Sequence, residues 1–257
     1  YLPAGFKYWT ERDFSLNREH PPLTKLLAAA PLLALHLKSP PDFGGNTHNP
    51  QAAAERQMKF GSTFLFAQDA DAIIFWGRLP MVAVGLLLGS CIFFWAKQLH
   101  GHAGAGLLSV FLFSLEPTLI AHSHYVTTDL AIAAFSVFTM FFLYRFSRKA
   151  QLLQLAIAAI GLGLAMASKF SAIFLCPVFF FLLHYRWPTR ELAASRPGYN
   201  RLSGRIIISM VALVMTGVTI QATYLFSSDL SLYWKGLLAV NANELPQSLL
   251  TYVHGQF

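Results

Sequence analysis

The chain is organised around one polar stretch, Asn17-Arg18-Glu19-His20-Pro21-Pro22-Leu23-Thr24-Lys25. Leucine and alanine then recur at three- and four-residue spacing from Leu23 to Leu37, which predicts a helix. The two prolines suit the start of that helix, where a missing N–H costs nothing, and Pro31 should kink it. A helix of this length reaches only about 22 Å, against an apolar membrane core of about 30 Å. We therefore predict an interfacial or re-entrant helix rather than a membrane span.

Longer apolar runs follow this helix and predict an all-α, polytopic integral membrane protein. Hydrophobic residues make up 55% of the chain and charged residues only 12%, with a mean hydropathy of +0.48. Soluble domains carry about 25% charged residues. Each run is close to the roughly 20 residues that a spanning helix needs. Six spans are predicted, at about residues 78–98, 105–121, 129–147, 151–167, 170–187 and 205–225.

The remaining segments are predicted to lie outside the membrane. Residues 1–77 should form a first outer loop, residues 78–225 the transmembrane bundle, and residues 226–257 the polar start of a later outer loop. Tyrosine and tryptophan near the start of the chain favour an interface between membrane and water. Within the first loop we expect an interfacial helix at about residues 4–14, an irregular segment at 38–60 and a short surface helix at 61–77.

The net charge of +7 is distributed as in a membrane protein and not as in a nucleic-acid-binding protein. Three segments between apolar runs (Lys97–Gly104, Arg145–Lys149 and Arg186–Arg205) hold nine lysine or arginine residues and one acidic residue. Such segments usually face the cytoplasm. This topology places both ends of the chain, the loop Ala121–Thr128 and the turn Ser168-Lys169 on the outer side. No aromatic-interleaved basic patch suggests a nucleic acid partner.

Small residues mark the helix faces that are predicted to pack closely. The motif Gly85-x-x-x-Gly89 lies in the first span, and Gly161, Gly163, Ala165 and Ala167 lie in the fourth. Small residues let membrane helices approach one another, so we assign these positions to packing.

Eight ionisable residues are predicted to gather on the outer side. Charged groups near membrane depth cost about 2.5–3.5 kcal/mol at a helix centre, so they tend to be paired or functional. This one-sided distribution suggests a site. Its members are Glu19, His20, Lys25, Glu116, His122, His124, Asp129 and Lys169.

Each of these residues also has an ordinary structural explanation. Lys25 can extend its ammonium group from an interfacial helix, and Asp129 can cap the third span. Glu116 can face water at a helix end, the histidines can be loop residues, and Lys169 can anchor a turn at the interface. Glu19 and His20 are the strongest candidates, because the adjacent prolines restrict the chain and lower the entropy lost in fixing a site.

The quoted stretch resembles segments of the protein O-mannosyltransferase and lipid A aminoarabinose transferase superfamily, which have the GT-C fold and use polyprenyl-phosphate sugars. That superfamily carries His-Pro-Pro-Leu-x-Lys and Glu-Lys-Pro-Pro-Leu motifs. Arg78-Leu79-Pro80 resembles the opening of a family span. The segments Ala121-His122-Ser123-x-Tyr125-Val126-Thr127-Thr128-Asp129-Leu130 and Gly163-Leu164-x-x-x-Ser168-Lys169-Phe170 resemble its second outer loop and its lysine turn. The matches follow the expected order over nearly the whole chain.

The resemblance implies roles for individual residues. Glu19 resembles a carboxylate that binds a divalent metal ion in some members, and that ion is the only cofactor implied. His20 takes the place of a lysine that contacts the lipid phosphate, and Lys25 and Lys169 are expected to contact the same phosphate. Asp129 matches an acidic residue beside the active site, so Asp129 and Glu19 are the predicted catalytic residues. His122 and Glu116 are candidates for the same site.

The resemblance also predicts that the chain is an internal fragment. The family's first outer loop begins with an Asp-Glu pair whose Asp is expected to be the catalytic base, and that pair would lie just before Tyr1. The fragment alone is therefore expected to be inactive.

The predicted function is transfer of a sugar from a polyprenyl-phosphate carrier to an acceptor hydroxyl on the outer face of a bacterial inner membrane. The expected partners are the lipid-linked sugar, a protein, lipid or glycan acceptor, and membrane lipids. Two alternatives remain open from the residues alone. The chain can belong to a transporter or flippase for a lipid-linked or anionic solute, or it can be a structural scaffold. Charges confined to one face, without a repeat, are unusual for transporters, whose sites lie near the bilayer midplane.

Overall fold

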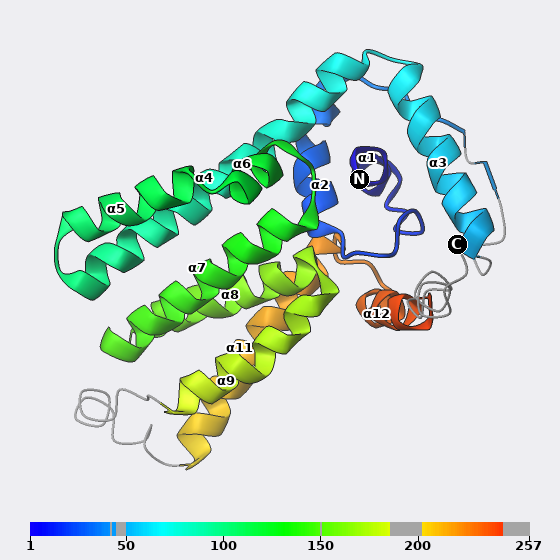
Figure 1. Ribbon diagram of the computed structural model, residues 1–257. Coiled ribbons are helices and arrows are strands. Elements are labelled where there is room, and N and C mark those ends of the chain that lie inside the picture. Colours follow the sequence, from blue (N-terminus) through cyan, green and yellow to red (C-terminus); the bar gives the residue numbers. More distant parts are fainter. Residues whose placement is uncertain (42, 45–49, 150, 186–201, 244–257) are drawn as a thin grey trace, which may run out of the picture.

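The computed structural model describes residues 1–257 except 42, 45–49, 150, 186–201 and 244–257 (Figure 1). Every regular element in the described part of the chain is a helix, which confirms the predicted all-α class. Helices α4 (Ala70–His100), α7 (Thr128–Lys149) and α11 (Leu202–Thr223) are long and apolar enough to cross a membrane. The predicted polytopic membrane architecture is therefore confirmed.

The first span begins earlier than predicted. Helix α4 starts at Ala70 because Asp69 caps it, accepting a hydrogen bond from the Ala72 amide at 3.0 Å. It ends before Gly101, whose φ of 77° is left-handed. The surface helix predicted at 61–77 therefore has the wrong limits. Residues 38–60 are also not wholly irregular, since helix α3 runs from Pro50 to Phe66.

The second predicted span, 105–121, is broken. Helices α5 (Ala103–Ser114) and α6 (Pro117–His124) meet at an angle of 70°. Pro117 has no amide hydrogen to continue a helix, and the Glu116 carboxylate caps the new helix by accepting from the Thr118 amide at 3.1 Å. Hydropathy alone does not reveal this bend, because the run stays apolar on both sides of it.

The fourth and fifth predicted spans are short apolar helices. Helix α8 covers Leu152–Ser168, and a 3₁₀ turn, η2 (Phe170–Phe174), leads into α9 (Leu175–Tyr185). Residues 186–187 of the fifth predicted span lie outside the described residues. By length and composition, the described residues thus contain three candidate spans, or four if the bent pair α5–α6 is one span, rather than six.

Small residues bring α8 close to its neighbours, as predicted. A Cβ atom placed on Gly161 would lie 2.7 Å from Thr139 Oγ1 of α7, and one on Gly163 would lie 2.6 Å from Thr219 Cβ of α11. The Thr216 hydroxyl of α11 donates to the Ala159 carbonyl at 3.1 Å. These contacts hold α7, α8 and α11 together as the centre of the bundle.

The N-terminal helices pack against one end of this bundle (Figure 1). Helix α1 covers Leu2–Glu11, α2 covers Leu23–Ala29, and the chain then continues as the 3₁₀ helix η1 (Ala30–Leu35). The predicted kink at Pro31 is thus a change of helix type. The tail, predicted to be polar loop, contains helix α12 (Leu232–Asn243), which lies near the same end.

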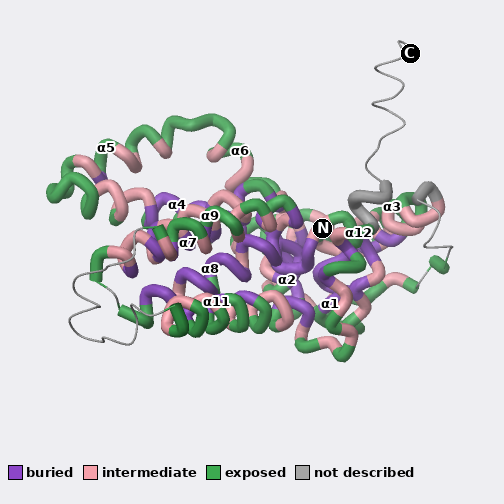
Figure 2. The backbone as a smooth tube through the Cα atoms, turned by 90° about the horizontal axis from the view of Figure 1, so that it is seen from below, coloured by how far each residue is buried: buried purple, intermediate pink, exposed green. Residues whose placement is uncertain are grey.

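The burial pattern distinguishes the sides of the bundle from the end at which the N-terminal helices pack (Figure 2). Figure 2 shows that α5 and α11 expose much of their length, whereas α2 is largely buried. The exposed side chains include Leu107 of α5 and Ile207 of α11, which are 63% and 61% accessible. Apolar sides of this kind suit helices that face lipid. Among the polar residues singled out from the sequence, Lys25 lies in α2, Asp129 lies in the first turn of α7 and Lys169 ends α8, at the end of the bundle near α12 (Figure 1).

Candidate functional site

The loop between α1 and α2 is fixed by buried polar residues. Lys7, 2% exposed, forms an ion pair with Asp13 at 2.9 Å, and Asp13 also accepts from the Ser15 amide at 2.8 Å. Burial raises the pKa of Asp13, but the hydrogen bonds from Lys7 and Ser15 outweigh it and leave the pKa lowered. Asn17 has a left-handed φ of 56°, a conformation that costs energy in a residue with a side chain.

Lys25 is buried beneath this loop. Its side chain is 0% exposed, and its ammonium nitrogen donates to the His20 carbonyl at 2.7 Å, to the Asn17 carbonyl and to Tyr8 Oη at 3.3 Å. Burial lowers its pKa to about 7, although the charge of Glu19 acts in the opposite direction. All three donor positions of the ammonium group are directed at protein oxygens. The phosphate contact predicted for Lys25 does not fit this geometry.

Asp129 and Lys169 form an accessible ion pair at the same end of the bundle. Helix α7 begins at Thr128, so Asp129 lies in its first turn and is not the N-cap that the sequence suggested. Lys169 ends α8, and its Nζ atom lies 2.8 Å from Asp129 Oδ1. The side chains of Lys169 and Asp129 are 32% and 51% exposed. An exposed pair contributes little to stability, about 0–1 kcal/mol, and it remains reachable by a ligand.

His20 links the loop to this ion pair. Its ring stacks on Tyr1, with centroids 6.1 Å apart. Burial lowers the pKa of His20, the charges of Lys25 and Lys169 lower it further, and Asp129 opposes them. His20 therefore lies within electrostatic reach of both lysines. A lowered pKa keeps the imidazole neutral at pH 7, so it can donate or accept a hydrogen bond but supplies no positive charge.

The other predicted site residues differ in whether they interact with this ion pair and its neighbours. His122 Nδ1 lies 3.0 Å from Thr127 Oγ1, and the charge of His122 acts on Asp129. Glu19 is exposed, and its negative charge acts to raise the pKa of Lys25 and the pKa of the Tyr1 hydroxyl. The cluster so defined consists of Glu19, His20, His122, Asp129 and Lys169, and it is called the outer cluster because the sequence predicts these residues on the outer side.

Glu116 and His124 have local partners instead. Glu116 caps α6, as described above, and His124 Nδ1 lies 2.7 Å from the Ile120 carbonyl oxygen within the same helix. Both residues are exposed. None of the interactions described for Glu116 links it to the outer cluster, so we leave it out of the candidate site.

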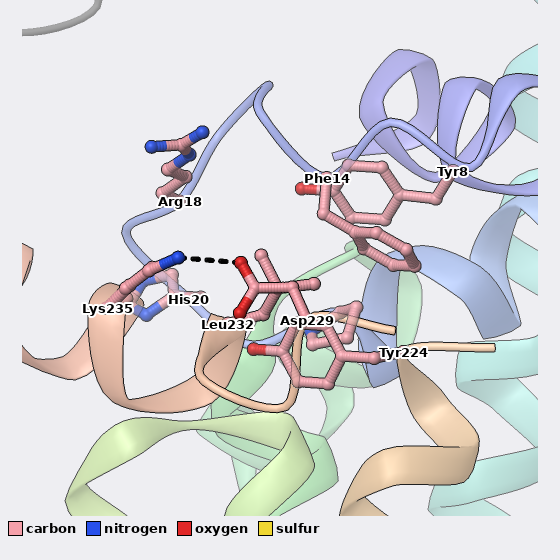
Figure 3. A pocket seen from close by; sticks show the side chains of 10 residues that line it. Tyr8, Phe14, Arg18, His20, Tyr224, Asp229, Leu232 and Lys235 are labelled. Carbon is pink, nitrogen blue, oxygen red and sulfur yellow. Dashed lines mark hydrogen bonds and ion pairs between the residues drawn. The ribbon is translucent and has the colours of Figure 1, made fainter. Parts of the chain in front are cut away.

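A pocket of about 290 Å³ adjoins the outer cluster, with His20 in its wall. In Figure 3, the basic side chains of the pocket lie on one side and the rings of Tyr8 and Phe14 on the other. Asp229 holds Lys235 at 2.7 Å and accepts from the Ser231 amide at 3.0 Å; these bonds lower the pKa of Asp229 to about 2. The lining residues are Tyr8, Phe14, Arg18, His20, Pro22, Tyr224, Asp229, Leu232, Lys235 and Gly236.

Of these lining residues, only His20 was predicted from the sequence; the polar residues that were missed include Arg18, Tyr224, Asp229 and Lys235. Arg18 stands inside the quoted stretch, next to Glu19. Tyr224 lies at the end of the last predicted span, and Asp229 and Lys235 follow that span, in a segment that was assigned only a polar character. Its mixture of Asp, Ser, Tyr and Lys was the only available signal, and it does not show that the segment folds back onto residues 8–22.

The metal ion that the resemblance implies is not supported by a ligand set here. Among the described residues, no group of three or more His, Cys, Asp or Glu side chains is arranged to hold a metal ion. Glu19 offers one exposed carboxylate. We therefore derive no chemical step through a metal, and metal binding at Glu19 stays a prediction.

The arrangement of the outer cluster predicts opposite shifts of the His20 pKa in two variants. Lys169→Met removes a cation that disfavours the imidazolium form, so the pKa of His20 should rise. Asp129→Asn removes an anion that favours that form, so the pKa should fall. NMR titration of ¹⁵N-labelled histidine in lipid nanodiscs measures both. Shifts in the same direction, or no shift in either variant, would contradict the placement of His20.

Comparison with known proteins identifies the family. Residues 62–215, more than half of the chain, match the model of the dolichyl-phosphate-mannose-protein mannosyltransferase family. The match includes Asp129 and Lys169, whereas Glu19, His20 and Lys25 precede it. No curated protein and no solved structure matches the chain. With its apolar helices and this match, the chain belongs to the dolichyl-phosphate-mannose-protein mannosyltransferase family, a family of membrane glycosyltransferases.

Proposed function

We propose that this chain belongs to an enzyme that moves a sugar from a polyprenyl-phosphate carrier to an acceptor hydroxyl. The observation that carries the proposal is the Asp129–Lys169 ion pair, which lies within the family match and within electrostatic reach of His20. Such a reaction needs a cation near the phosphate and a carboxylate near the acceptor. Both groups are present, accessible and 2.8 Å apart.

Lys169 is the proposed phosphate contact. Displacement at the anomeric carbon releases a phosphate monoester, and a cation aimed at that developing charge stabilises the transition state. Of the cations first predicted for this role, Lys25 is buried and occupied, and His20 is neutral at pH 7. Lys169 is about one-third exposed, so a phosphate group can reach it.

Asp129 and Glu19 are the proposed catalytic carboxylates. A carboxylate can take the proton of the acceptor hydroxyl as the new bond forms. Asp129 also holds the Lys169 ammonium group in place until the phosphate arrives. The adjoining pocket of about 290 Å³, which combines aromatic rings with charged groups, offers space for a sugar beside His20.

The outer face of the membrane is the proposed location of the site. Helices α4, α7 and α9 end at His100, Lys149 and Tyr185, at the end of the bundle opposite the outer cluster (Figure 1), and the basic segments adjoin these helix ends in the sequence. Positively charged loops favour the cytoplasmic side. In a bacterial inner membrane, the outer cluster would therefore face the periplasm, and the lipid carrier would enter sideways between helices.

Neutralising Lys169 tests the proposed phosphate contact. In the complete protein reconstituted in vesicles, Lys169→Met should lower kcat for transfer from a polyprenyl-phosphate hexose about tenfold, equal to about 1.4 kcal/mol of transition-state stabilisation. Glu19→Gln should have a similar effect. The matched control is Lys149→Met, an exposed lysine at the other end of α7, which should leave transfer unchanged.

The same assay separates the competing functions. Equal losses of transfer activity in Lys169→Met and Lys149→Met would contradict the assignment of Lys169 to the site. Movement of the lipid-linked sugar across the vesicle membrane without transfer would favour a flippase. Variants that alter only assembly of the protein would favour a scaffold.

A further inference from the structure

The position of Lys25 is unfavourable by ordinary electrostatic rules. The residue is fully buried, and desolvation of an ammonium group is costly unless it is paired. It also stands in the first turn of α2, where the helix dipole disfavours a positive charge. Its three described hydrogen-bond partners are two carbonyls and a hydroxyl, not a carboxylate. Nothing in this arrangement explains Lys25 as a stabilising ion pair.

The partners of Lys25 belong to one short segment. Nζ binds the carbonyls of Asn17 and His20, which lie on either side of Arg18 and Glu19. Tyr8, 2% exposed, receives a hydrogen bond from Lys25 and donates its own hydroxyl to the Leu16 carbonyl. Two buried side chains from α1 and α2 thus hold three carbonyls of residues 16–20.

This segment needs such support. Asn17 is held at φ 56°, and its side-chain oxygen is buried without a hydrogen-bond partner in the described structure. The following prolines have no amide hydrogens with which to form backbone bonds. A strained backbone persists only where surrounding contacts determine it. The side chains of Arg18, Glu19 and His20, which this backbone carries, are the ones that reach the pocket and the outer cluster.

We propose that Lys25 and Tyr8 form a buried clamp that fixes the backbone of residues 16–20, so that Glu19 and His20 face Asp129 and Lys169. Lys25 is then a positioning residue and not a phosphate ligand. The clamp itself concerns only the order of this loop. Its expected effect on catalysis rests on the proposed function.

Two substitutions test the clamp by different routes. Lys25→Met removes the ammonium group, and Tyr8→Phe removes a single oxygen while keeping the ring that packs 4.8 Å from Phe14. The second variant should fold even if the first does not. The matched control is Tyr233→Phe, because Tyr233 is also buried, at 5% exposed, but its hydroxyl has no hydrogen-bond partner in the described structure.

Limited proteolysis of the complete protein in nanodiscs measures how well the loop is ordered, and it does not depend on sugar transfer. Tryptic cleavage after Arg18 should become at least about tenfold faster, relative to cleavage after the exposed Lys59, in Lys25→Met and Tyr8→Phe. Tyr233→Phe should cleave at the wild-type rate. An unchanged rate at Arg18 in both clamp variants would overturn the proposal.

Transfer kinetics then separate positioning from phosphate binding. The clamp predicts that both variants lower kcat about tenfold with the KM for the lipid donor within about twofold of wild type. It also predicts that the double variant is no worse than Lys25→Met alone, because both changes release one loop. A raised donor KM with an unchanged kcat in Lys25→Met would make Lys25 a phosphate ligand and reject the clamp. If cleavage at Arg18 is faster in the two clamp variants but the wild-type protein shows no sugar transfer, the clamp stands and the proposed function is rejected.

Discussion

Asp129→Asn is expected to lower sugar transfer by the complete protein roughly a hundredfold, equal to about 2.7 kcal/mol of transition-state stabilisation. The substitution keeps the shape of the side chain and removes its charge. It takes away a proposed catalytic carboxylate and also releases Lys169, whose Nζ atom lies 2.8 Å from Asp129 Oδ1. Two proposed functions are therefore lost in one change. Steady-state kcat and kcat/KM with a polyprenyl-phosphate hexose measure the effect.

The control for this variant must separate the site from the helix. Asp129 stands in the first turn of α7, where any carboxylate interacts favourably with the helix dipole. Asp71 occupies the first turn of α4 and is exposed, so Asp71→Asn removes the same kind of interaction away from the outer cluster. Transfer should be unchanged in Asp71→Asn. Similar losses in both variants would show that Asp129 acts through its helix and not in the site.

Coupling between Asp129 and Lys169 gives a finer check on the same prediction. If the two side chains act as a unit, the double variant Asp129→Asn/Lys169→Met should be about as active as Asp129→Asn alone. Additive losses would mean that the ion pair of the resting protein has no role in transfer.

Gly5→Ala is expected to destabilise the protein by about 3 kcal/mol, at the upper end of the usual cost of overpacking. A Cβ atom on Gly5 would overlap the carbonyl oxygen of Lys25 and lie 2.9 Å from Ala29 Cβ. The first obstacle is backbone, which cannot rotate away. Helix α1 would have to leave α2, and the loop held by Tyr8 and Lys25 would move with it. The apparent melting temperature in detergent should fall.

A second glycine provides the matched control. Gly61 lies within α3, and a Cβ atom there would meet no atom of the described residues within 4 Å outside its own helix turn. Gly61→Ala should therefore stabilise the protein by roughly 0.5–1 kcal/mol through the better helix propensity of alanine. A melting temperature that moves in the same direction for both variants would contradict the close packing of α1 on α2.

Much of the fold can be predicted from the sequence, because apolar runs and prolines act locally. The runs that became α4, α7 and α11 are long enough to recognise, and Pro21-Pro22 marks the start of α2 correctly. The bend before Pro117 and the length of α3 were missed. In the first case, hydropathy averages over the break; in the second, a segment rich in Pro, Gly, Asn and Gln was taken to be irregular.

The candidate site was predictable only in part, because its contacts are not local. Asp129 and Lys169 were both selected as polar residues at span ends, yet their pairing across 40 positions needs the packing of α7 on α8. Lys25 was identified, but its burial depends on Tyr8, 17 residues away in the chain. The pocket brings Arg18 together with Asp229 and Lys235 from beyond the last span. No periodicity in the sequence reports that return of the chain.

The most direct test of the central claim is transfer by the complete protein in sealed vesicles, with polyprenyl-phosphate hexose and acceptor supplied only on the side that carries the outer cluster. We expect the labelled sugar to become covalently attached to the acceptor, and we expect Asp129→Asn to abolish most of that signal while Asp71→Asn preserves it. Passage of the lipid-linked sugar to the opposite side with no labelled acceptor would contradict the account, and the outer cluster would then belong to a transport pathway.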